Sequence, residues 1–305
     1  MRPRLIELLT EEFHRQSFYF LTADIGFGFL NPLAELMGQR FINVGISETN
    51  LLGVAAGLSS PQEKVYTLGL GPFIALRGYE QIKVDLATHQ CNVCMIAAGV
   101  GFYYGIQGPT HYTLEDISLL SNISGLAIYN PGTLGELEWS FNQISASSTP
   151  SYLRLPRLKG TWHFDKLSSS IGPSYYCCQE GTALTVITSG TMLDEVLKAL
   201  PDNCQVISCP RPAPLNLSKL TDHLTSSKVV VVEEAVYPGP LASQVSLELW
   251  RCQGLANRKY QFHSLALKER ALDAPYGDEN FMRQQHGLDA SSLKTYLSHL
   301  LKETT

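Results

Sequence analysis

The chain has 305 residues, a length typical of about two domains, and 44% of them are hydrophobic, as in ordinary globular proteins. Charged residues make up 17%, compared with about 25% in most soluble domains, which is a weak indication that another chain covers part of the surface. The net charge is −5 and no basic tract occurs, which argues against nucleic acid as a partner because phosphate binding needs clustered Lys and Arg.

The termini, uncharged runs and cysteines give no sign of secretion or membrane insertion. The first residues, MRPRLIELLTEEF, carry Glu7, Glu11 and Glu12 where a secretory signal needs an apolar core. The longest uncharged run contains glycines, a proline and a histidine, which is not typical of a membrane helix. Seven irregularly spaced cysteines do not form a disulfide framework. We therefore predict a soluble, cytoplasmic protein without a membrane partner.

The first half of the chain alternates short β-rich runs with helical stretches, which is typical of βαβ units and a parallel sheet. The predicted strands are Ser17–Asp24, Phe41–Gly45, Lys64–Gly69, Cys91–Gly99, Leu126–Gly132 and Ser151–Arg157. The predicted helices are Glu48–Leu58, Phe73–Ala87, Leu114–Asn122 and Thr133–Ser145. Ligands of such sheets lie beyond the carboxyl ends of the strands, so polar residues just after each strand are the candidates for a site.

A segment rich in Ser, Lys and Gly interrupts this alternation, and the pattern then resumes. Strands are predicted at Thr182–Gly190 and within CQVISCP, KVVVVEEA and QFHSL, with helices at Leu241–Arg251 and Ser291–Leu301. We predict an α/β protein of two domains, each a mostly parallel sheet flanked by helices. The first domain spans residues 1–160, a linker spans 161–175, and a smaller second domain spans 176–305.

Two polar residues after predicted strands could carry chemistry. Glu48 begins an apolar helix, where a carboxylate could simply satisfy the helix dipole or, if desolvated, could donate a proton. His111 lies at the tip of a Gly108–Pro109 turn, where a lone His is more often structural than catalytic. Cys91 and Cys94 form a CxxC pair without a second pair, so no metal site is predicted on this chain.

Five motifs in a fixed order strengthen the case that Glu48 and His111 carry chemistry. They are TADIGFG, FINVGISETN, FIALRGYEQI, GPTHYTLEDISLL and YLRLPR, followed later by EGTALTVITSGTML, KVVVVEEAVYPGPLASQV and HGLDASSLKTYL. Together they resemble the pyrimidine-binding and C-terminal domains of the transketolase family, over essentially the whole chain. The resemblance implies a thiamine diphosphate enzyme of that fold.

The resemblance also implies roles for individual residues. Glu48 matches the glutamate that pairs with the pyrimidine nitrogen of thiamine diphosphate, and it activates the cofactor, whose chemistry the protein orients. His111 matches the histidine that faces the substrate, so Glu48 and His111 are the predicted catalytic residues. The predicted cofactor-binding residues are Asp24, Ile46, Glu48, Phe73 and Arg77. The predicted substrate-binding residues are His111, Arg154 and Gln107. Phe73 could instead be a core residue, and Arg154 a surface residue after a strand.

Two departures from the family pattern concern the partner and the substrate. The Gly-Asp-Gly signature of the diphosphate domain is missing, so the resemblance implies the C-terminal subunit of a split transketolase. A partner subunit would carry that domain and ligate Mg²⁺, which binds oxygen ligands and phosphates, in a two-plus-two heterotetramer. Gly99 and Gln107 replace a family His and Asp, so the identity of the sugar stays open.

The predicted reaction is transfer of a two-carbon ketol unit from a ketose, phosphorylated or not, to an aldehyde. One alternative is the β subunit of a 2-oxo acid dehydrogenase or of an acyloin-forming thiamine enzyme, which share both domains and are also split. Another is a non-catalytic scaffolding relative, which would have no need of Glu48 or of the GPTH motif.

Overall fold

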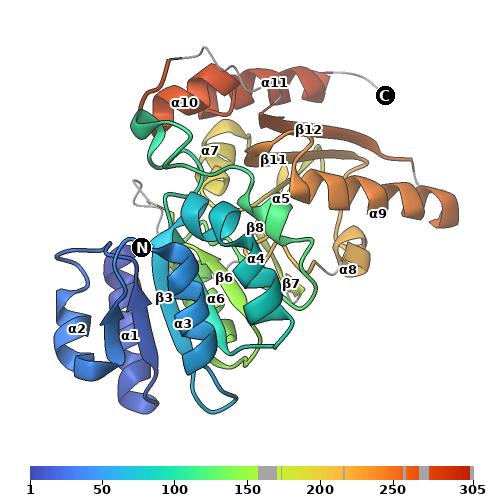
Figure 1. The fold of residues 1–305 in the computed structure, drawn as a ribbon. Helices are drawn as coiled ribbons and strands as arrows, with labels where there is room; N and C mark the ends of the chain where they lie inside the picture. The colour runs from blue at the N-terminus through green and yellow to red at the C-terminus, as the bar shows by residue number, and fades with distance from the viewer. Residues whose placement is uncertain (157–169, 173, 216, 257–258, 268–274, 303–305) are drawn as a thin grey trace.

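The computed structural model describes residues 1–156, 170–172, 174–215, 217–256, 259–267 and 275–302. They form two six-stranded sheets, each with helices packed against it. Figure 1 shows the N-terminal unit in blue to green, and the C-terminal unit in yellow to red packed on one end of it. The predicted α/β class with two mostly parallel sheets is confirmed.

The first sheet is parallel throughout, with strand order β2-β1-β3-β4-β6-β5. Its strands are β1 (Tyr19–Thr22), β2 (Phe41–Asn43), β3 (Val65–Leu70), β4 (Val93–Ala98), β5 (Ala127–Tyr129) and β6 (Ser151–Arg154). Its helices are α1 (Arg2–Arg15), α2 (Asn31–Met37), α3 (Glu48–Leu58), α4 (Tyr79–Gln81), α5 (Asp116–Leu120) and α6 (Leu134–Ser145). Strands β3 and β4 are buried along almost their whole length, as their continuous apolar sequences require in the middle of a parallel sheet.

The helical segment after β3 differs from its prediction. A single helix was expected over Phe73–Ala87, but two π-helical turns, η2 (Phe73–Arg77) and η3 (Ile82–Ala87), flank the short α4. Gly78 lies at the break, where an added Cβ would overlap the Leu52 side chain and the Ile74 carbonyl. The wider π turn therefore follows from close packing of this segment on α3, and such turns are frequent at functional sites.

Helices α1 and α2 were not predicted. Helix α1 has Leu5, Leu8, Leu9 and Glu12 on its buried face, a spacing of three to four residues that is typical of an amphipathic helix. Helix α2 begins with a proline at its first turn and ends at Gly38, which has a positive φ of 55°.

The second sheet has the order β12-β11-β9-β10-β8-β7, with β7 and β8 antiparallel to their neighbours. Its strands are β7 (Ser170–Gly172), β8 (Tyr175–Gln179), β9 (Thr185–Thr188), β10 (Gln205–Ser208), β11 (Lys228–Val236) and β12 (Gln261–Leu267). Its helices are α7 (Met192–Ala199), α8 (Leu217–Asp222), α9 (Pro240–Ala256), α10 (Glu279–His286) and α11 (Ala290–Lys302). Most of the predicted linker 161–175 lies outside the described residues, but β7 and the start of β8 lie within it, so the second sheet begins earlier than expected.

The two units contact each other directly beside the first sheet. The Ile128 amide of β5 donates to the Ala213 carbonyl at 2.7 Å, and the Asn130 amide donates to the Pro210 carbonyl at 2.8 Å. The second unit therefore lies next to the carboxyl end of β5 in the first sheet. None of the helices described is both long and apolar enough to cross a membrane.

Candidate active site

The polar residues that follow the strands of the first sheet lie along one edge. Strands β1 to β4 are parallel neighbours, so their carboxyl ends meet there. Asp24 follows β1, Glu48 follows β2, Phe73 follows β3, and His111 lies in the loop after β4. The fold thus brings four of the predicted site residues to the edge where ligands of such sheets bind.

Glu48 is the buried carboxylate of this edge, with 2% of its surface exposed. It is the first residue of α3, where the helix dipole favours a negative charge. One oxygen, Oε2, lies 3.3 Å from Nη1 of Arg77. This is the sole hydrogen bond of the Glu48 side chain within the described part of the chain, so its other oxygen is available to a ligand.

Phe73, Arg77 and His111 form a chain of contacts that ends at Glu48. The Arg77 guanidinium lies 4.5 Å from the centre of the Phe73 ring, a cation–π distance. The Phe73 ring in turn meets the His111 ring edge to face at 5.8 Å. The π turn of η2 carries both Phe73 and Arg77. Phe73 is partly exposed and touches His111, so it is not a fully buried core residue.

His111 and Gln107 line a cavity of about 320 Å³ beside this group. The cavity also has apolar walls from β3, β4 and the segment after β1. His111 Nδ1 lies 2.8 Å from the hydroxyl of Thr110, which fixes the ring orientation. A cavity of this size, with apolar walls and few polar groups, has the character of a small-molecule site.

Arg2 also lines this cavity, and no sequence pattern identified it. The N-terminus of α1 delivers it, and Nη2 donates to the Tyr104 hydroxyl at 3.2 Å. The guanidinium also lies 5.2 Å from the Phe29 ring and 5.4 Å from the Tyr103 ring. Aromatic rings thus hold a cation at the cavity wall. The period of α1 could have predicted the helix, but not the contact with the distant loop after β4.

Asp24 and Ile46 lie exposed on the same edge. Asp24 has a positive φ of 54° and exchanges two hydrogen bonds with the Asn43 side chain, at 2.9 and 3.1 Å. Asn43 also accepts the Gly45 amide at 2.9 Å, which shapes the turn that leads to α3. Ile46 is 77% exposed and Phe27 is 99% exposed.

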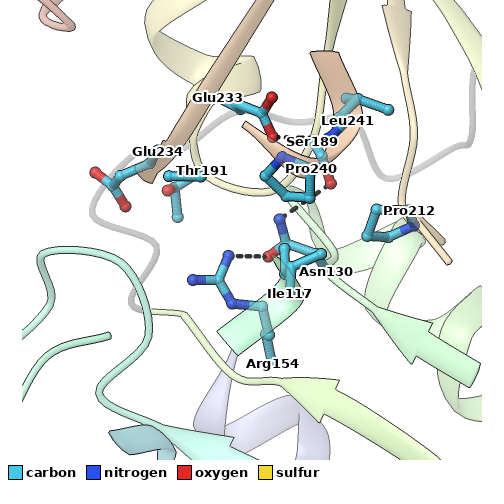
Figure 2. Close-up of a pocket in the computed structure, with 11 residues that line it drawn as sticks. Ile117, Asn130, Arg154, Ser189, Thr191, Pro212, Glu233, Glu234, Pro240 and Leu241 are labelled. Atoms are coloured by element: carbon cyan, nitrogen blue, oxygen red, sulfur yellow. Dashed lines mark hydrogen bonds between the residues drawn. The ribbon is translucent and has the colours of Figure 1, made fainter. Parts of the chain in front are cut away.

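Arg154, the third predicted substrate-binding residue, lies buried where the two units meet. It is 4% exposed, and its Nε donates to Asp116 Oδ2 at 2.9 Å. Nη1 donates to Asn130 Oδ1 at 3.2 Å, and Asn130 donates to the Ser189 hydroxyl of the second unit (Figure 2). Nη2 contacts the Thr113 carbonyl at 3.4 Å. The guanidinium thus lies in a water-sized pocket between the two units, away from the residues that line the larger cavity.

The structure is that of an α/β protein with a candidate ligand site, which contains a carboxylate, at the edge of a parallel sheet. Comparisons with known proteins specify the class. The model of the family "Transketolase, pyrimidine binding domain" matches residues 9–161, half of the chain. The chain therefore belongs to the transketolase pyrimidine-binding family. The predicted resemblance is confirmed.

Curated relatives and a solved structure cover most of the chain. A 6-deoxy-6-sulfo-D-fructose transketolase subunit of Clostridium sp. (strain MSTE9) is 28% identical over 69% of this chain and 67% of its own. An apulose-4-phosphate transketolase subunit of Actinobacillus succinogenes is 26% identical over 86% of this chain and 85% of its own. A structure titled "Split gene transketolase, inactive beta4 tetramer" has a TM-score of 0.82 and 21% identity, over 98% of this chain and 97% of its own. These findings support the prediction of a subunit of a heteromeric transketolase.

Proposed function

We propose that this chain is the C-terminal subunit of a split, thiamine diphosphate-dependent transketolase that moves a two-carbon ketol unit from a ketose to an aldehyde. The observation that carries the proposal is Glu48, a buried carboxylate at a helix start, beside an aromatic residue and a histidine-lined cavity. Family membership and relatives named as transketolase subunits support it. A scaffold would need neither the carboxylate nor the cavity.

The residues around Glu48 fit the pyrimidine end of thiamine diphosphate. The ring needs an acidic partner for its nitrogen and an apolar face, and Glu48 has an oxygen available beside Phe73. Arg77 holds the other oxygen and so orients the carboxylate, while Asp24 and Ile46 lie at the rim. The chemistry that the cofactor supplies is a carbon nucleophile and electron sink. Glu48 would hold the proton at the ring nitrogen, and burial keeps water from competing for it.

The cavity residues would bind the sugar. His111 can donate to or accept from the hydroxyls and carbonyl oxygen of a ketose, and Gln107 adds amide donors and an acceptor. Arg2 places a fixed positive charge at the same cavity, and a guanidinium binds a phosphate or sulfonate group through two parallel hydrogen bonds. We therefore propose an anionic ketose as donor. Arg154, which is buried against Asp116, is not among these residues.

We assign the diphosphate and Mg²⁺ to a partner subunit. The exposed apolar side chains Phe27 and Ile46 at the site edge support such a contact, since water-exposed aromatic and aliphatic groups are stabilised when a second chain covers them. Two copies of this chain and two copies of the partner would form a heterotetramer in the cytoplasm. In such an assembly each site lies next to a partner chain.

The test is reconstitution. The chain is used to capture its partner from the native source, and the purified complex is assayed with thiamine diphosphate, Mg²⁺, a ketose phosphate and an aldehyde. We expect ketol transfer by the complex and none by either subunit alone. A complex that consumes a 2-oxo acid but no ketose would instead assign the chain to the dehydrogenase β subunits. A complex that uses no donor would refute an enzymatic role.

A further inference from the structure

The loop that carries His111 lies against the C-terminal unit. This loop, residues 99–113, runs between β4 and α5 and also carries Gln107. Figure 1 shows it reaching α10, which is far further along the chain. From the first unit, Arg2 of α1 and Phe73 of η2 contact this loop at Tyr104 and His111. Residues of the second unit contact it as well and help to fix its position.

Glu234, in β11, makes the central contact with the loop. Its Oε2 accepts the Phe102 amide at 3.3 Å, and both residues are buried. Gly101 precedes this amide with a φ of +59°, and a Cβ there would overlap Glu234 Oε2. The backbone at Gly101 and the Glu234 carboxylate therefore approach so closely that only glycine fits at this position.

Arg283, in α10, fixes the Glu234 carboxylate. Its Nε lies 2.7 Å from Glu234 Oε1, and Nη2 donates to Glu279 Oε1 and to the Thr191 hydroxyl, both at 2.8 Å. Nη1 lies 3.5 Å from Glu195. Because Arg283 is itself buried and held by several groups, one Glu234 oxygen stays directed at the Phe102 amide.

Further contacts follow the loop toward the site. The Phe102 ring stacks on His286 at 5.5 Å with an angle of 7° between the rings. Gly105 leaves no room for a Cβ against the Gly277 carbonyl, and Gly108 faces the ring of Tyr276. The contacts with the second unit thus extend along the loop from Gly101 to Gly108, close to His111 in the sequence.

We infer that Glu234, oriented by Arg283, is a positioning residue for the reaction: through the Phe102 amide it holds the His111 loop in the geometry that presents His111 and Gln107 to substrate. This inference rests on the proposed function. Among the residues described, the C-terminal unit contributes none to the lining of the His111 cavity. Through Glu234 it nevertheless has a role in turnover.

The kinetic test uses Glu234→Ala in the reconstituted complex. A side chain misplaced by about 1 Å costs up to about 100-fold in rate, so we expect kcat to fall about 10- to 100-fold. The affinity for thiamine diphosphate should stay at the wild-type value, because Glu48 lies on α3, and Phe73 and Arg77 lie on η2, outside the loop. Glu234→Gln keeps an acceptor for the Phe102 amide and should recover most of the rate.

Glu233→Gln is the matched control. Glu233 is the neighbouring buried glutamate, but it accepts the Leu241 amide (Figure 2) and the Ala242 amide at the start of α9. Within the described part of the chain, its side chain has no hydrogen bond to the loop. Equal loss of kcat in both variants would overturn the inference, because it would indicate general destabilisation. An unchanged kcat in Glu234→Ala would overturn it as well.

Hydrogen exchange tests the same contact without any activity. In the full chain, Glu234→Ala should speed exchange of the amides in residues 99–113, while Glu233→Gln should not. If the wild-type complex shows no ketol transfer, the proposed function fails and this measurement still decides whether Glu234 holds the loop. Wild-type exchange in the loop of Glu234→Ala would refute the contact itself.

Gly101→Ala tests the contact from the other side. The added methyl meets Glu234, so the variant should lose kcat as Glu234→Ala does, and combining the two changes should cost less than the sum. Gly38→Ala is its control, since Gly38 has a similar φ of 55° but open space around its Cβ position. Equal losses of kcat in Gly38→Ala and Gly101→Ala would mean that backbone strain, not the Glu234 contact, matters.

Discussion

Arg77 Nη1 lies 3.3 Å from Glu48 Oε2, yet the two partners differ in exposure: the Glu48 side chain is 2% exposed and that of Arg77 is 56% exposed. The carboxylate is thus removed from water, whereas its partner cation stays in contact with water. Loss of the pair leaves Arg77 solvated rather than buried and unpaired, so the pair contributes little to stability. The pair instead orients the Glu48 carboxylate, because Arg77 holds one of its oxygens and leaves the other for a ligand.

Glu48→Gln should therefore abolish turnover without unfolding the protein. We expect kcat to fall by at least about 100-fold, because an amide cannot hold the proton at the cofactor ring. The free energy of unfolding should change by about 1 kcal/mol or less, because Arg77 stays exposed. Glu63→Gln is the control, since Glu63 also pairs with an arginine, Arg40 at 2.6 Å. Turnover within a few-fold of wild type in Glu48→Gln would remove Glu48 from the site.

His111→Gln should lower turnover by about 100-fold, the usual size of a general acid–base contribution, through loss of the imidazole. Cofactor affinity should persist, because Phe73 and Glu48 remain. The measurement is steady-state kinetics with titration of thiamine diphosphate, and His89→Gln, at an exposed position, serves as control. A variant that loses cofactor binding and turnover in parallel would show that His111 acts through Phe73 instead.

Arg2→Met should raise the KM for an anionic ketose by about tenfold or more, since a hydrogen bond to a charged group is worth about 1.5–3 kcal/mol. A neutral ketose should show no such change. Arg4→Met is the control on the same helix, because Arg4 pairs with Glu138 at 2.6 Å, and neither residue lines the cavity. Equal effects on neutral and anionic donors would contradict phosphate or sulfonate binding by Arg2.

Glu233 should make stability fall as pH rises. Burial raises the pKa of Glu233 from 4.5 to about 7, although the Ala242 and Leu241 amides lower it. Between these two values the folded state holds a proton that the unfolded state releases, so the free energy of unfolding decreases with pH over that window.

Denaturant unfolding at several pH values checks this. From about pH 4.5 to 7.5, wild type should lose on the order of 2–3 kcal/mol relative to Glu233→Gln, which cannot ionise. A constant difference for Glu233→Gln would show that the pKa of Glu233 is the same in the folded and unfolded states.

Local sequence accounts for much of the fold. A continuous apolar run such as β4 is typical of a strand buried inside a parallel sheet, and helix α3 has the bounds that its sequence predicted. Residues that follow such strands must lie at one edge, so the strand pattern alone made Glu48 and His111 candidates for a site at that edge. The helix over Phe73–Ala87 could not be predicted correctly, because Gly78 and its packing on α3, not propensity, set the π turns.

The two sheets, the order of their elements and the edge that carries the site thus follow from patterns along the chain, because strand and helix periods act over neighbouring residues. Which side chains meet at that edge depends on long-range packing instead. That packing buried Arg154 against Asp116, brought Arg2 to the cavity, and set Glu234 on the His111 loop. The partners in these contacts lie 38, 102 and 132 residues apart, and no local pattern encodes such separations.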